Sequence, residues 1–250
     1  KWEKLLKKKI KGEYAFIMLE FDNLNNLRKV VVSRDQIGIR PLYYHPYSEG
    51  SKIMLFSSEI KGTISFDGEI NEFPPGQIIT YNLNEFRNTS TFVYDFNNVY
   101  NQISIPSFIT DSMEDSEKTL LALVRNAVIN SVRRRLDADR PLAFLLSGGV
   151  DSSLVVAISA KILGQPVNTF CCGMKEGTDL FYAKKVAEHI GSNHTEVFFT
   201  EDEGLNAIPD VVYTTETWDT TTIRASVGQY MVSKYIGTKT DCRVVLVGEG

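Results

Sequence analysis

Short alternations of hydrophobic and polar residues dominate the first third of the chain. Apolar runs at residues 14–21 and 29–33 flank the segment DNLNNL, whose Asn and Asp residues favour a hairpin turn. Three further apolar runs follow at residues 42–44, 52–56 and 77–81. Strands this short and closely spaced predict a mostly antiparallel sheet.

The pattern changes near residue 110. Residues 94–110 carry Asn, Ser and Pro without a hydrophobic period, and we interpret them as a linker. Beyond it, apolar residues such as Leu120 and Val124 recur at helical spacing. Strands are then predicted at residues 142–146, 167–172, 195–199 and 243–247, and helices at residues 152–163, 179–190, 203–214 and 222–236. This alternation predicts an α/β domain with a parallel, doubly wound sheet.

Several residues mark the ends of these helices. Gly164 and Gly191 stand where C-terminal caps belong, because glycine adopts the left-handed conformation without strain. Thr200 and Glu203 have the spacing of a capping box. Thr222 is a candidate N-cap for the last predicted helix.

Composition and charge narrow the class of protein. The 250 residues are 43% hydrophobic and 23% charged with a net charge of -4, which suits a globular protein and disfavours a nucleic-acid binder. No apolar run reaches the roughly 20 residues that cross a bilayer. Three cysteines, two of them adjacent, cannot build a disulfide framework, and we expect a cytoplasmic protein. The basic opening KWEKLLKKKIKG fits a targeting or membrane-surface helix or, as we favour, the solvated face of a helix that is cut off upstream.

The segment SGGVDSS, residues 147–153, lies between a predicted strand and a predicted helix. A strand that enters a helix through small residues exposes backbone N–H groups at the helix N-terminus, where the helix dipole favours anions. Gly148 and Gly149 would let a ligand approach the backbone closely, because they have no Cβ. Hydroxyl donors are added by Ser147, Ser152 and Ser153. The loop therefore predicts a phosphate-binding site, against the alternative of a tight turn with capping serines.

Asp151 in this loop cannot contact a phosphate favourably, since like charges repel, but it suits a Mg²⁺ ion that bridges to the phosphates. The loop lacks the Lys of a Walker motif, so it represents another class of phosphate cradle. It resembles the signature loop of the ATP-pyrophosphatase families, which cleave ATP to AMP and pyrophosphate while adenylating a substrate. The resemblance implies ATP and Mg²⁺ and leaves the substrate open.

Three other stretches select one family among these. Residues 33–62 resemble the back half of the glutaminase domain of asparagine synthetases, through the elements Arg-Asp, Arg-Pro-Leu-Tyr, Ser-Glu and Lys-Gly. Residues 216–226, ETWDTTTIRAS, and residues 245–250, VLVGEG, resemble two segments of the synthetase half of that family. The resemblance implies the C-terminal part of an α+β N-terminal-nucleophile glutaminase domain, with linker, over residues 1–110. It implies a truncated ATP-pyrophosphatase domain, similar to adenine nucleotide alpha hydrolases, over residues 111–250.

The same resemblance assigns site residues by their position in the matching segments. Leu146 and Cys172 correspond to contacts with adenine, and Val247 and Gly248 to contacts with the rest of the nucleotide. Val247 replaces a Ser of the family, which removes one hydroxyl donor. The remaining assignments are Glu249 as the catalytic carboxylate, Asp179 as a metal ligand beside Asp151, and Thr221, Thr222 and Arg224 as aspartate-binding candidates.

The implied activity is the ATP-dependent amidation of aspartate to asparagine through β-aspartyl-AMP, with ammonia from glutamine, and a homodimer is the assembly we consider. Residue 1 is Lys and no Cys precedes Cys171, so these residues hold no nucleophile for glutamine hydrolysis. We therefore expect a fragment of a longer product, since both ends cut through recognisable motifs. Two alternatives stay open, a β-lactam-type synthetase and a non-catalytic adenine-nucleotide-binding protein.

Overall fold

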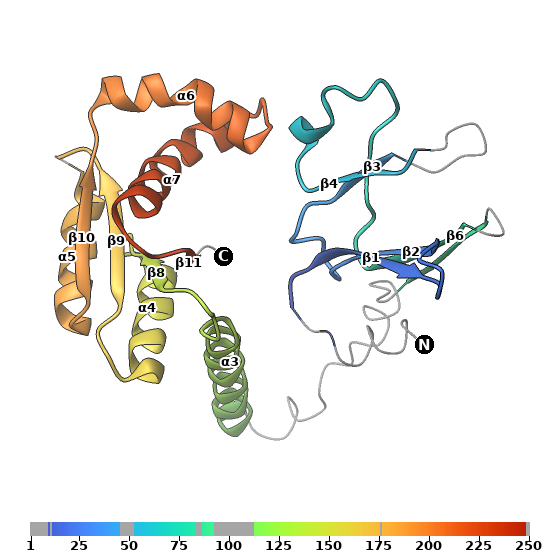
Figure 1. The fold of residues 1–250 in the computed structure, drawn as a ribbon. Coiled ribbons are helices and arrows are strands. Elements are labelled where there is room, and N and C mark those ends of the chain that lie inside the picture. The colour runs from blue at the N-terminus through green and yellow to red at the C-terminus, as the bar shows by residue number, and fades with distance from the viewer. Residues whose placement is uncertain are drawn as a thin grey trace. The chain divides into compact units, whose positions relative to one another are not determined.

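In the computed structural model, the chain divides into two compact units, Lys1–Ile105 and Pro106–Gly250 (Figure 1). The described residues are 10, 12–45, 53–83, 87–92, 113–175 and 177–248. The linker predicted at residues 94–110 and nearly all of the basic opening segment lie outside them. Within the described ranges, no helix is both long enough and apolar enough to cross a membrane.

The first unit contains two antiparallel sheets. Its elements are β1 (Ala15–Phe21), β2 (Leu27–Arg34), β3 (Tyr43–His45), β4 (Leu55–Ser57), the 3-10 helix η1 (Ile60–Thr63), β5 (Asn71–Glu72), β6 (Gln77–Asn82) and β7 (Arg87–Phe92). Four strands pair in the order β1-β2-β6-β7, and three pair in the order β4-β3-β5. The prediction of one sheet is therefore wrong. Strands β5 and β7 were missed because their sequences, NE and RNTSTF, show almost no apolar alternation.

The predicted hairpin at DNLNNL is confirmed, since β1 and β2 pair antiparallel around it. Asp22 Oδ1 accepts hydrogen bonds from the N–H groups of Leu24 and Asn26, which fixes the turn. The β2 strand is covered on both faces. Val32 packs with Phe73, and Val31 packs with Ile78 on the opposite face.

The second unit is built on a parallel sheet, as predicted. Its strands are β8 (Leu142–Leu145), β9 (Asn168–Gly173), β10 (Asn193–Phe198) and β11 (Val244–Leu246), and its helices are α3 (Met113–Arg135), α4 (Val150–Leu163), α5 (Thr178–Ile190), α6 (Glu201–Thr215) and α7 (Thr220–Lys239). The strand order is β10-β9-β8-β11, with every neighbouring pair parallel. The chain thus progresses from β8 outward to β10 and then returns to place β11 on the other side of β8.

Helices cover both faces of this sheet, which makes it doubly wound. On one face, Phe144 of β8 packs with Val156 of α4 and Ala183 of α5. On the other face, Ala143 packs with Val232 of α7. Figure 1 shows α5 and α7 on opposite sides of the strands. In such sheets ligands bind beyond the carboxyl ends of the strands where the strand order reverses, which is here between β8 and β11.

The predicted helix ends are confirmed at three places and wrong at one. Gly164 and Gly191 end α4 and α5 in the left-handed conformation, with φ of 65° and 74°. Thr200 and Glu203 form the complete capping box of α6. Thr222, however, is not a cap. The N-cap of α7 is Asp219, whose carboxylate accepts a hydrogen bond from the Thr222 N–H at 2.7 Å, so the helix begins earlier than expected.

Candidate functional site

A cavity of about 160 Å³ lies at the carboxyl edge of the parallel sheet, near the point where the strand order reverses. Its lining includes residues that the sequence had assigned to the nucleotide site, namely Leu146, Ser147, Ser152, Cys172, Asp179, Val247 and Gly248. The sequence analysis missed the lining residues Leu145, Phe170, Cys171, Gln229 and Val232. Parallel strands end at the same edge, which brings these distant segments together.

Polar groups gather where β8 enters α4. The Ser152 hydroxyl lies 2.9 Å from the Ser147 hydroxyl and accepts a hydrogen bond from the Ser147 N–H at 3.3 Å. The Ser153 hydroxyl donates to the Gly149 carbonyl at 2.6 Å. These serines therefore brace the loop against the first turn of α4. Because N–H groups in a first turn have no acceptor within their own helix, they are available to an anion.

Two glycines of the site are required by backbone packing. A Cβ on Gly148, whose φ is +81°, would lie 2.6 Å from the backbone of Tyr182 and Ala183 in α5. A Cβ on Gly248 would lie 2.5 Å from Cα of Ser152 in α4. Only at Gly149 is there room, since a Cβ there would meet nothing closer than the Ser147 hydroxyl at 3.4 Å. Close approach of a ligand can therefore explain the lack of a side chain only at Gly149. At Gly148, α5 occupies the space that a side chain would need.

The two predicted metal ligands stand in the first turns of two helices. Asp151 is exposed at the start of α4, and Asp179, at the start of α5, is exposed and lines the cavity. The described residues contain no group of three or more His, Cys, Asp or Glu side chains placed to hold a metal ion. Mg²⁺ is commonly held by one or two carboxylates together with phosphates and water. Two separate aspartates at the carboxyl edge of the sheet fit that mode and do not fit a metal cage made of protein alone.

The aspartate-binding candidates lie on the first turns of α7, and all three side chains are exposed. Thr221, Thr222 and Arg224 are not among the described residues that line the cavity. The Asp219 carboxylate accepts a hydrogen bond from the Thr222 hydroxyl at 2.7 Å and another from the Thr222 N–H. These two bonds hold the pKa of Asp219 below its usual value. Glu249, the predicted catalytic carboxylate, lies outside the described residues.

The two cysteines in the lining are neutral thiols. Burial raises the pKa of Cys171 to about 12, and its sulfur lies 3.3 Å from Nε2 of His194. Burial also lowers the pKa of His194, whose Nδ1 lies 2.9 Å from the Thr169 hydroxyl. The Cys172 thiol donates to the Gly228 carbonyl at 3.0 Å, and burial raises its pKa. Neither thiol is poised as a nucleophile, and both belong to the apolar part of the cavity.

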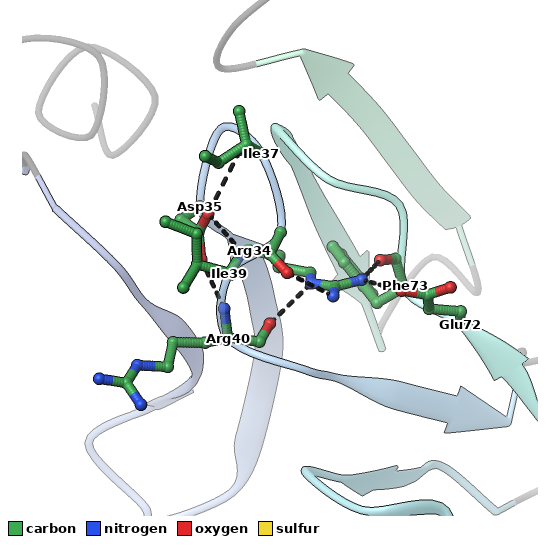
Figure 2. Close-up of polar contacts among 8 residues, drawn as sticks. Arg34, Asp35, Ile37, Ile39, Arg40, Glu72 and Phe73 are labelled. Carbon is green, nitrogen blue, oxygen red and sulfur yellow. Dashed lines mark hydrogen bonds and ion pairs between the residues drawn. The ribbon is translucent and has the colours of Figure 1, made fainter. Parts of the chain in front are cut away.

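In the first unit, Arg34 and Asp35 tie together the loop that follows β2 (Figure 2). The Arg34 side chain is only 5% exposed. Its guanidinium donates to the carbonyls of Gly38, Arg40 and Phe73 and to the Glu72 carboxylate, each at 2.7 Å. A buried cation with this many acceptors holds the loop in one conformation.

The Asp35 carboxylate completes the network from the other side of the loop. It is buried, which alone would raise its pKa, but N–H groups of Arg40, Ile39, Tyr14 and Ile37 donate to it. These bonds outweigh burial and hold the pKa of Asp35 below its usual value. The partners of both residues are parts of the fold, which supports structural roles for Arg34 and Asp35.

Comparison with known proteins gives two family matches that together span nearly the whole chain. Residues 1–105 match the glutamine amidotransferase domain, and residues 123–250 match asparagine synthase. The glutamine-hydrolyzing asparagine synthetase of Gallus gallus is 38% identical over 254 residues, covering 96% of this chain and 44% of that protein. The probable glutamine-hydrolyzing asparagine synthetase of Acanthamoeba polyphaga mimivirus is 38% identical over 249 residues, with the same coverage.

The glutamine-hydrolyzing asparagine synthetase of Homo sapiens is 34% identical over 263 residues and is covered to the same extent. The chain thus spans less than half the length of these relatives. Within that span, the β-rich first unit carries the glutamine amidotransferase match, and the doubly wound second unit carries the asparagine synthase match. The chain belongs to the asparagine synthase family.

Proposed function

We propose that this protein takes part in the ATP-dependent amidation of aspartate to asparagine. In this reaction the side-chain carboxylate of aspartate attacks the α-phosphorus of ATP, which releases pyrophosphate and forms β-aspartyl-AMP. Ammonia then displaces AMP. The observation that carries the proposal is the cavity at the carboxyl edge of the parallel sheet, where Ser147 and Ser152, the start of α5 and the end of β11 meet.

The cavity has an apolar part and a polar part, and a nucleotide needs both, one for its base and one for its phosphates. Apolar side chains of Leu146, Phe170, Cys172 and Val232 form one part, which suits a purine base. The start of α4, with Ser147 beside it, forms the other part, which suits phosphates. We infer that Leu146 and Cys172 contact adenine, as the sequence predicted.

Besides Ser147 and the start of α4, we propose that Gly149, Val247 and Gly248 contact the phosphates. Asp151 and Asp179 would hold Mg²⁺, which would neutralise charge on the pyrophosphate as it leaves. Their exposed positions in two first turns leave them free to share one ion with the phosphates. The bracing serines 147, 152 and 153 keep the loop in shape for this contact.

For the acceptor we propose Thr221, Thr222 and Arg224, because an Arg guanidinium near a helix N-terminus can pair with a carboxylate through two hydrogen bonds. Glu249 is proposed to help deprotonate the incoming amine. The name of the first unit's family supports glutamine as the source of ammonia. A homodimer in the cytoplasm is also part of the proposal, and the free state of Cys171, Cys172 and Cys242 is consistent with a reducing compartment.

An exchange assay tests the adenylation step. Isotopically labelled pyrophosphate is incubated with the protein, ATP and Mg²⁺, with and without aspartate, and label in ATP is measured. We expect exchange that depends on aspartate. Exchange that is indifferent to aspartate would point to another acceptor, such as the substrate of a β-lactam-type synthetase. Nucleotide binding without any exchange would instead support a non-catalytic adenine-nucleotide-binding protein.

A further inference from the structure

One polar side chain in the cavity has no role in the assignments above. Gln229 of α7 lines the cavity next to apolar groups that include Phe170, Cys172 and Val232. Its carboxamide offers both hydrogen-bond donors and an acceptor. In an otherwise apolar wall, such a group decides which polar groups of a ligand can be placed against it.

The direction of α7 places Gln229 at the mouth of the cavity. The residue Cys242, just after α7, donates its thiol to the Leu142 carbonyl at the start of β8, at 3.4 Å. The C-terminal end of α7 therefore lies at the amino ends of the strands, and the helix runs antiparallel to them, so that its N-terminal half lies toward their carboxyl edge. Val232 is 2% exposed and packs in the same cluster as Phe170, deep in the cavity wall. Gln229 lies one turn closer to the carboxyl edge and is exposed.

The backbone beside Gln229 is held against the end of β9. The Cys172 thiol donates to the Gly228 carbonyl at 3.0 Å. A Cβ on Gly228 would lie 3.3 Å from that sulfur, so the helix and the strand are already in close contact. This contact fixes the turn of α7 from which the Gln229 side chain starts.

The lining residue Val247, just after β11, is 45% exposed and has no side-chain donor or acceptor. In the nucleotide pose proposed above, the base lies on the apolar part and the phosphates lie at the start of α4. The ribose that joins them then lies at the mouth of the cavity, beside Gln229.

We propose that Gln229 is a specificity-determining residue that hydrogen-bonds the ribose hydroxyls of the nucleotide. A vicinal diol presents donors and acceptors, and a carboxamide can satisfy both. This inference rests on the proposed function, because it requires the nucleotide to occupy this cavity. It predicts that the protein distinguishes ribonucleotides from deoxyribonucleotides through Gln229.

The test compares the binding of ATP, 2′-deoxy-ATP and 3′-deoxy-ATP in the presence of Mg²⁺, by calorimetry, in the full chain and in Gln229→Leu. Leucine has nearly the same length and is a good helix former, so the variant should fold. The matched control is Gln165→Leu, which changes an exposed Gln in the turn between α4 and β9, away from the carboxyl edge. The selectivity ratio of one sample does not depend on the fraction of protein that is folded.

We expect the unaltered chain and Gln165→Leu to prefer ATP over at least one deoxy form by about three- to tenfold, the value of one neutral hydrogen bond. Gln229→Leu should bind ATP as weakly as that deoxy form. A preference that survives in Gln229→Leu, or an equal loss for all three nucleotides, would overturn the role of Gln229 while leaving ATP binding intact. If the unaltered chain binds none of them, the nucleotide site itself is wrong, and both proposals fall.

Discussion

Replacement of Gly148 by Ala tests why the loop before α4 contains two glycines. The structure gives two separate reasons against a side chain at this position. Its φ of +81° is strained for any L-residue, which costs about 1–2 kcal/mol. In addition, the new Cβ would lie 2.6 Å from the backbone of Tyr182 and Ala183, so α5 would have to move. Overpacking of this kind costs about 1–3 kcal/mol. The sum of about 2–5 kcal/mol is large against the usual stability of a domain.

Two other glycines, at the two ends of α4, separate the conformational cost from the packing cost. Gly164 has a similar φ of +65°, but a Cβ added there would meet nothing within 4 Å, so Gly164→Ala reports the conformational cost alone. Gly149 has an ordinary φ of -70° and only the Ser147 hydroxyl at 3.4 Å, so Gly149→Ala should change stability by less than about 1 kcal/mol. The order of destabilisation should be Gly148→Ala, then Gly164→Ala, then Gly149→Ala.

The measurement is hydrogen exchange followed by mass spectrometry, because a chain with two units need not unfold in one step. Peptides from β8 and α4 report the opening free energy of the second unit, and peptides from β2 and β6 report the first unit as an internal control. If Gly148→Ala and Gly164→Ala destabilise the second unit equally, contact with α5 is not what excludes a side chain at Gly148, and the packing argument is refuted.

Three further predictions concern the nucleotide site and the first unit. Gly149→Val should abolish ATP binding with an unchanged circular dichroism spectrum, and equal affinity would make the loop a structural turn only. Val247→Ser should tighten ATP binding about ten- to a hundredfold in calorimetry, because a hydroxyl can donate to a charged phosphate oxygen; weaker or equal binding would place this residue elsewhere. Arg34→Met should destabilise the first unit by about 3–5 kcal/mol in hydrogen exchange, because it leaves buried acceptors without a donor. The matched control Arg28→Met, which breaks a half-exposed ion pair with an Asp, should cost less than about 1 kcal/mol; equal effects would contradict the role given to the Arg34 network.

The sequence by itself determined the local structure of this protein. Residues that repeat with the period of a helix or a strand encode their own element, because the backbone bonds of a helix are made within the element and its apolar side must be buried. Gly164, Gly191 and the pair Thr200 and Glu203 marked helix ends correctly, since a cap depends on neighbours within a few residues. Where two local solutions compete, the sequence is ambiguous. Asp219 caps α7 in place of Thr222, and either side chain could have served.

Only the tertiary structure decided which distant segments meet. The order β10-β9-β8-β11 brings Gly248 against the start of α4, and no local pattern records that pairing. The same packing explains Gly148 through α5 and adds Phe170, Val232 and Gln229 to the cavity wall. In the first unit, the polar strand β7 is recognisable only through its pairing with β6, and the pairing of β2 with β6, about fifty residues later in the chain, helps to separate the unit into two sheets. Strand pairing and helix packing are contacts between remote residues, so their energy appears only when the whole unit is assembled.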